Sequence, residues 1–119
     1  MLIGIGTDII EIDRIKKACE KYGFKEKIFT ESEINYAGEN MAALAGNFAV
    51  KEAVSKVFGT GFRTFRPKDI EVLRDELGKP YVVLYNKALE IKEKHNVINI
   101  QVSISNSDKY AVAFAVGES

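Results

Sequence analysis

The stretch from Leu44 to Gly61, LAGNFAVKEAVSKVFGTG, constrains the fold of this chain more than any other. It contains no proline, and its large apolar side chains supply the contacts of a helix at Phe48, Val54, Val57 and Phe58. Glycine readily adopts the left-handed backbone conformation that ends helices, and Gly59-Thr60-Gly61 follows the last apolar residue. The pattern therefore predicts one central helix that ends at these glycines.

Two charged residues of the predicted helix share one of its faces. Glu52 precedes Lys56 by four residues, which is about one helical turn. Such a pair is most often a solvated ion pair on a protein surface, so the spacing by itself does not indicate chemistry.

A further carboxylate, Asp8, lies near the start of the chain. Leu2, Ile3 and Ile5 predict a short buried strand, and Asp8 follows where that strand should end. A carboxylate in this position can bind a hard cation such as Mg²⁺, which prefers oxygen ligands. An aspartate there could equally cap a helix or stabilise a turn, so both interpretations stay open.

The composition is that of an ordinary soluble globular protein, and we expect residues 1–119 to form a single domain. Hydrophobic residues make up 46% of the chain and charged residues 29%. No segment has the length and apolarity of a transmembrane helix, and the charged N-terminal region is unlike a signal peptide. The single cysteine, Cys19, cannot form an internal disulfide, which favours a cytoplasmic location. We expect Cys19 to be a small, partly buried residue of a helix. A net charge of zero argues against a general nucleic-acid-binding protein.

This neutral total hides a basic segment between residues 14 and 27. Six cations occur there against two glutamates: Arg14, Lys16, Lys17, Lys21, Lys25 and Lys27. Ile12, Ile15 and Cys19 have helical spacing and would form the inner face, leaving several cations exposed. Such a helix could steer an acidic partner into place, although a basic face is most often only solvated.

The remaining elements predict an α+β fold, with a small antiparallel sheet packed against the long central helix and shorter helices. Thr30 and Glu33 have the spacing of a capping box, and residues 36–41 predict a break. Strands are expected at 69–75, 80–85, 98–105 and 110–116. A helix at 86–95 should end at His95, the only histidine, as a surface cap. The loop 62–68 contains two arginines and two aromatic residues, and it could border a phosphate-rich ligand or be an ordinary loop.

The last expected strand has two apolar faces. Alanines at 111, 113 and 115 alternate with Val112, Phe114 and Val116. One face should pack on a helix, and another subunit could cover the other.

Three motifs follow one another along the chain: GIGTDIIEIDR from Gly4 to Arg14, FAVKEAVSK from Phe48 to Lys56, and Gly59-Thr60-Gly61. Shorter segments accompany them, namely IFTESE at 28–33, LGKP at 77–80 and VSIS at 102–105. In order, spacing and chain length, this set resembles the holo-acyl-carrier-protein synthases. These are the small, single-module group of the 4'-phosphopantetheinyl transferases.

The resemblance implies transfer of the 4'-phosphopantetheine arm of coenzyme A to a serine of apo-acyl carrier protein, a step of fatty acid biosynthesis that releases 3',5'-ADP. It implies that Asp8 and Glu52 bind Mg²⁺, with Mn²⁺ as a possible substitute, and that Lys56 contacts a phosphate. Gly59-Thr60-Gly61 would allow coenzyme A to approach the backbone closely. Either Glu52 or a water molecule on the metal could accept the serine proton.

The resemblance also implies partners. An acidic acyl carrier protein would dock on the basic segment, with contacts at Arg14, Lys17, Lys21 and Phe24. Members of this family commonly form trimers with coenzyme A between subunits, so we expect a homotrimer.

Two positions depart from the family pattern. Asn47 stands where an arginine is usual and Asn106 where a histidine is usual, and both family residues are associated with the phosphates of coenzyme A. Asparagine can donate a hydrogen bond but carries no charge, so these positions should alter the affinity for coenzyme A. The competing interpretations are a non-catalytic module that binds acyl carrier protein, and a metal-dependent pyrophosphate hydrolase.

Overall fold

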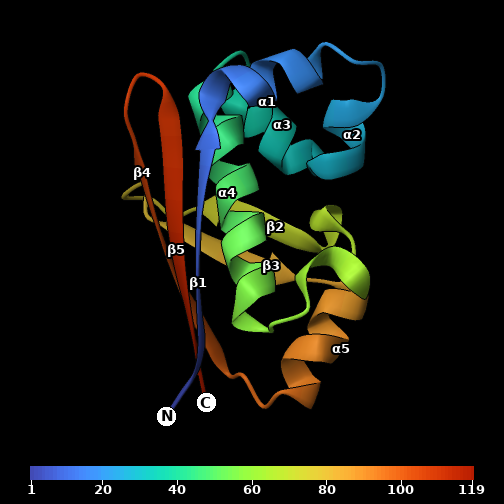
Figure 1. The fold of residues 1–119 in the computed structure, drawn as a ribbon, viewed down its shortest axis with the longest axis vertical. Coiled ribbons are helices and arrows are strands. Elements are labelled where there is room, and N and C mark those ends of the chain that lie inside the picture. The colour runs from blue at the N-terminus through green and yellow to red at the C-terminus, as the bar shows by residue number, and fades with distance from the viewer.

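Helix α4 (Met41–Val57) lies at the centre of the computed structural model, which describes residues 1–119 (Figure 1). The side chain of Asn40 caps its first turn by accepting a hydrogen bond from the backbone N–H of Ala43 at 3.1 Å. Beyond its end, Gly59 and Gly61 have φ values of 76° and 62°. The predicted central helix is therefore confirmed, and it begins three residues before the predicted start at Leu44.

A three-stranded antiparallel sheet covers one side of α4. Its strand order is β1 (Leu2–Glu11), β5 (Tyr110–Glu118) and β4 (Asn99–Asn106). The face of β5 toward the helix carries only small side chains, and these are almost fully buried: Ala111, Ala113 and Ala115. Small residues allow the helix and sheet backbones to approach closely. The α+β class and the antiparallel sheet are confirmed.

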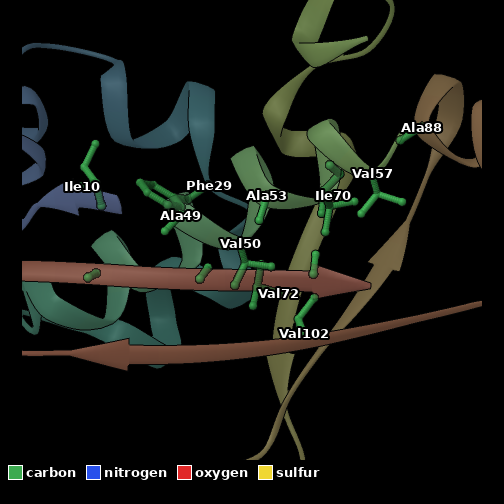
Figure 2. Close-up of a cluster of buried hydrophobic side chains, with 14 of the residues drawn as sticks. Ile10, Phe29, Ala49, Val50, Ala53, Val57, Ile70, Val72, Ala88 and Val102 are labelled. Carbon is green, nitrogen blue, oxygen red and sulfur yellow. The ribbon is translucent and has the colours of Figure 1, made fainter. Parts of the chain in front are cut away.

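A hairpin of β2 (Ile70–Arg74) and β3 (Pro80–Leu84) packs on another side of α4, followed by α5 (Asn86–Lys94). Figure 2 shows Ile70 and Val72 of β2 and Val102 of β4 in the same buried hydrophobic cluster as Val50 and Val57 of α4. Eleven of the 17 residues of α4 are consequently buried. The helix is thus the core element onto which both sheets pack.

Three short helices cover one end of α4: α1 (Ile12–Cys19), α2 (Phe24–Ile28) and α3 (Glu31–Ala37) (Figure 1). The inner face predicted for the basic segment is correct, since Ile15 is 2% exposed. The segment is nevertheless two helices, because Gly23 adopts a left-handed φ of 80° and begins a new one. The capping box of Thr30 and Glu33 is present. No helix combines the length and apolar character needed to cross a membrane.

The N-terminal strand corrects one prediction. It is ten residues long, and Asp8 lies inside it, because β1 pairs with β5 as far as Glu11 opposite Tyr110. Its outward face is exposed, as Ile5 and Ile9 show with 55% and 62% exposure. The strand is therefore neither short nor buried on both faces. The outward side of β5 is likewise only partly covered.

Candidate active site

Lys56 of α4 and Asp8 of β1 meet where the helix crosses the strand. The Lys56 Nζ atom donates a hydrogen bond to the carbonyl oxygen of Thr7 at 2.8 Å and lies 3.7 Å from Asp8 Oδ1. The side chains of Lys56 and Asp8 are 52% and 17% exposed. Lys56 thus pairs with the carboxylate on the strand, and the solvated Glu52–Lys56 pair suggested by the spacing is not formed.

Glu52 faces the same site, and its carboxylate forms no ion pair and accepts no hydrogen bond from the protein. Burial raises the pKa of Glu52, and the negative charge of Asp8 raises it further, while Lys56 opposes the shift. Burial also raises the pKa of Asp8, against the opposing effect of Lys56. The two carboxylates are therefore close enough to repel each other, and a cation between them would be favoured.

The donors present fit a hard cation. Asp8 and Glu52 provide only oxygen ligands, and no cluster of three or more histidine, cysteine or acidic side chains exists that could enclose a metal. Mg²⁺ is commonly held in this way, by one or two carboxylates together with substrate phosphates and water. Asp8 and Glu52 could hold such an ion.

One groove joins this acidic pair to the basic segment. It has a volume of about 690 Å³ and extends from Asp8 and Glu52 along α1. The residues predicted to contact a carrier protein all line it: Arg14, Lys17, Lys21 and Phe24. Lys17 also forms an exposed ion pair with Asp13 at 2.9 Å, which water and salt would weaken.

The remaining predicted residues lie outside the groove. Gly59-Thr60-Gly61 follows α4 about one turn beyond Lys56. Asn106 is the last residue of β4 and lies opposite Ala111 of β5, so this strand continues one residue beyond its predicted end at Ser105. Because β5 separates β4 from β1, the strand of Asn106 lies about 10 Å from that of Asp8.

Asn47, the other departure from the family pattern, is fully buried. Its Oδ1 atom accepts a hydrogen bond from Arg74 Nη2 at 2.8 Å, and its Nδ2 atom has no partner. Within one chain, Asn47 is therefore a core residue.

A buried polar cluster next to the site was missed by the sequence analysis. Lys51, the neighbour of Glu52, donates hydrogen bonds from Nζ to Glu33 Oε1 at 2.8 Å, to the Pro67 carbonyl at 3.1 Å and to the Ile70 carbonyl. The side chains of Lys51 and Glu33 are both 0% exposed. The sequence predicts only a capping role for Glu33. The available signal was a lysine seven residues after Leu44, within an otherwise apolar helical pattern.

An α+β core that presents two carboxylates and a lysine beside a basic groove is suited to group transfer from a phosphorylated donor. The sequence profile of the 4'-phosphopantetheinyl transferase superfamily matches residues 4–115. The chain therefore belongs to that superfamily.

Individual relatives place the chain more closely within this superfamily. The chain is 53% identical over 118 residues to holo-acyl-carrier-protein synthase of Lachnoclostridium phytofermentans, covering 99% of this chain and 97% of the relative. The crystal structure of the Neisseria meningitidis holo-acyl-carrier-protein synthase is 34% identical and covers both chains fully, with a TM-score of 0.90. The Bacillus anthracis synthase in complex with coenzyme A (3',5'-ADP) is 42% identical, covers 100% of this chain and 98% of that one, and has a TM-score of 0.83. Within the superfamily, this chain groups with the holo-acyl-carrier-protein synthases, which are transferases.

Proposed function

We propose that the chain performs the reaction of its family in the groove between β1, α1 and α4, with Asp8 and Glu52 in the groove and Lys56 beside Asp8 as the catalytic site. The reaction moves 4'-phosphopantetheine from coenzyme A to a serine of apo-acyl carrier protein. The single observation that carries the proposal is the continuity of the groove from Asp8 and Glu52 to the basic residues of α1. A carrier protein bound along α1 would bring its serine to the two carboxylates.

The chemistry is displacement at phosphorus. The serine oxygen forms a bond to the phosphorus that bears the pantetheine arm, and the bond from that phosphorus to the bridging oxygen breaks. The 3',5'-ADP leaves with the electron pair. Lys56 is exposed enough to reach a phosphate oxygen, and its charge stabilises the negative charge that grows on the leaving group.

Asp8 and Glu52 would hold Mg²⁺, or Mn²⁺ in its place, because they are two carboxylates of the groove that lie near enough to act on each other's charge, and both offer oxygen ligands. When bound, the ion neutralises pyrophosphate charge that would otherwise repel the nucleophile. Glu52 could also accept the serine proton, because its carboxylate has no protein partner.

The basic side of the groove supports an acidic carrier protein as partner. Arg14, Lys17 and Lys21 provide positive charge, and Phe24 provides an apolar contact. Such charges mainly steer association and fix orientation, so the carrier can dock quickly and leave after transfer.

The outward face of the sheet supports a homotrimer as the working form. Ile9 lies opposite Val112, and the neighbouring Phe114 is 46% exposed, so one apolar patch extends across β1 and β5. Coenzyme A between subunits would allow Gly59-Thr60-Gly61 and Asn106 to reach it, including Asn106 from a neighbouring chain. The free thiol of Cys19 agrees with a reducing cytoplasm.

The decisive experiment incubates the purified protein with coenzyme A, Mg²⁺ and apo-acyl carrier protein, and weighs the carrier by mass spectrometry. We expect the carrier to gain one phosphopantetheine group. Carrier binding without any gain would instead indicate a non-catalytic module. Cleavage of coenzyme A without modification of the carrier would indicate a pyrophosphate hydrolase.

A further inference from the structure

The backbone of β1 touches the backbone of α4 at Gly6, next to the proposed site. Gly6 lies two residues before Asp8, on the same face of the strand. A Cβ atom at Gly6 would overlap the carbonyl oxygen of Ala53 and lie 2.8 Å from its carbonyl carbon. Because these are backbone atoms of a helix, no side-chain rotation could relieve the overlap.

The turn of α4 that Gly6 touches is the one that carries the site. Ala53 follows Glu52 directly, and the Lys56 Cβ atom lies 3.0 Å from the same position beside Gly6. Lys56 Nζ also donates a hydrogen bond to the carbonyl oxygen of Thr7, the residue between Gly6 and Asp8. The strand and the helix are thus aligned by a backbone contact immediately beside the proposed catalytic side chains of Asp8, Glu52 and Lys56.

Backbone contact of this kind is confined to Gly4 and Gly6 among the nine glycines. At Gly4, a Cβ atom would overlap the carbonyl oxygen of Val57, one turn further along α4. At Gly46 of α4, the nearest atom would be Cγ2 of Ile104 at 3.1 Å, which belongs to a side chain that can move. Gly46 thus offers a matched comparison within the same helix.

We propose that Gly6 is a positioning residue: the absence of its side chain sets the distance from Asp8 to Glu52 and Lys56. The inference rests on the function proposed above. An alanine at position 6 must move the strand away from the helix by at least about 1 Å, because an ordinary carbon–carbon contact is about 3.5–4.0 Å and the overlap with the Ala53 carbonyl oxygen is tighter still. Asp8 moves with the strand, whereas Glu52 and Lys56 stay with the helix.

The test compares Gly6→Ala with wild type and with Gly46→Ala in the carrier-modification assay. Misplacement of a reacting group by about 1 Å can lower turnover by roughly 100-fold, and we expect a loss of that order in kcat for Gly6→Ala. Gly46→Ala should retain wild-type turnover to within about twofold, since alanine also favours a helix. A wild-type protein that modifies no carrier would refute the proposed function rather than the role of Gly6.

Two further readouts separate positioning from a general loss of structure. Titration calorimetry with Mg²⁺ alone should show weaker binding to Gly6→Ala than to Gly46→Ala. Asp8→Glu adds one methylene, about 1.5 Å of reach. It should lower activity in the wild-type background but raise it in Gly6→Ala, because the longer side chain compensates for the displaced strand.

If Gly6→Ala does not fold, as judged by circular dichroism, the same measurements are made on Gly4→Ala. Its added Cβ atom overlaps the helix backbone less severely. We then expect losses of the same sign but smaller size. Folded Gly6→Ala or Gly4→Ala with wild-type kcat and Mg²⁺ affinity would overturn the inference. So would a failure of Asp8→Glu to raise the activity of a displaced variant.

Discussion

Two lysines of α4, five residues apart, have opposite surroundings. Lys51 is fully buried and donates to three acceptors: the Glu33 carboxylate and two backbone carbonyls. Lys56 is half exposed, donates to one carbonyl and lies 3.7 Å from Asp8. Lys51 therefore uses all three of its N–H groups within the protein, whereas Lys56 keeps donors available.

This difference separates a charge that holds the fold together from charges that can act on a ligand. Burial lowers the pKa of Lys51, and the charge and hydrogen bond of Glu33 oppose that shift. Removing one member of such a buried pair leaves an uncompensated charge in the core. We call the site of Asp8, Glu52 and Lys56 the open site, because solvent reaches it. There the Glu52 carboxylate has no protein partner, so binding a cation or phosphate breaks no interaction of its side chain. We infer that α4 uses one lysine for stability and the other for catalysis.

The strongest test of the open site replaces Asp8 or Glu52 by alanine. Either change should lower turnover by roughly 10³-fold or more and weaken Mg²⁺ binding, because metal stabilisation of phosphate charge contributes several kcal/mol. The melting temperature should change little. Asp13→Ala removes an acidic residue from the same groove and is the matched control. Near-normal transfer by Asp8→Ala or Glu52→Ala would contradict the assignment of these ligands.

Exchanging each lysine for methionine tests the comparison directly. Lys51→Met leaves Glu33 buried without its partner and should lower the free energy of unfolding by about 3–5 kcal/mol. Lys56→Met removes an exposed pair and should change that free energy by less than about 1 kcal/mol, while lowering kcat strongly. Denaturant unfolding and steady-state kinetics measure both effects. Equal loss of stability in the two variants would show that the lysines do not differ in role.

Charge reversal at the basic end of the open groove should affect the carrier rather than the chemistry. Arg14→Glu, Lys17→Glu and Lys21→Glu combined should raise KM for the carrier about tenfold and flatten its dependence on salt, since the charges steer association. The affinity for coenzyme A should change little. The matched control reverses Lys87, Lys92 and Lys94 of α5, which gives the same net charge. An unchanged carrier KM would mean that the carrier docks elsewhere.

The pH dependence of the open site should run in opposite directions for activity and for stability. Folding raises the pKa of Asp8 and Glu52, so as pH falls the native protein takes up protons before the unfolded chain does. Without metal, these groups should therefore add stability as pH falls from their raised values toward the ordinary 3.8 and 4.5. Mg²⁺ binding and turnover should fall over the same range.

Unfolding at several pH values, for wild type and for Asp8→Asn combined with Glu52→Gln, measures this contribution. The double variant should be the more stable protein at pH 7 without metal, and the difference should shrink in acid. A wild type that is more stable than the double variant at neutral pH would contradict the assigned shifts.

The smallest expected effect concerns Asn106, which lies in neither of these two regions. Asn106→His introduces a group that gains positive charge in mild acid, so coenzyme A should bind several-fold more tightly, and more so at lower pH. One partly exposed charged contact contributes on the order of 1 kcal/mol. The dissociation constant across that pH range measures it. A flat response would assign the phosphate contact to another residue, such as Arg63.

The elements that the sequence predicted well are those whose formation depends on residues close together in the chain. The central helix, its glycine end and the capping box of Thr30 and Glu33 each depend on residues close together in the chain. The β2–β3 hairpin follows from two β-rich runs around a short loop. By contrast, the length of β1 was underestimated because its pairing with β5 joins opposite ends of the chain. The break at Gly23 was also missed, since the basic residues continue through it.

The sequence by itself proposed Asp8, Glu52 and Lys56 as site residues through the family motifs in which they occur, because residue type and motif spacing are local properties. Only the tertiary structure decided that Lys56 pairs with Asp8 instead of Glu52, and that Lys51 forms a buried ion pair with Glu33. An ion pair depends on which side chains the packing of separate elements brings within a few ångströms. Here that packing depends on a strand and a helix whose backbones touch at Gly6. Helical periodicity places Lys51 and Lys56 on the helix, but it does not specify what lies opposite each of them.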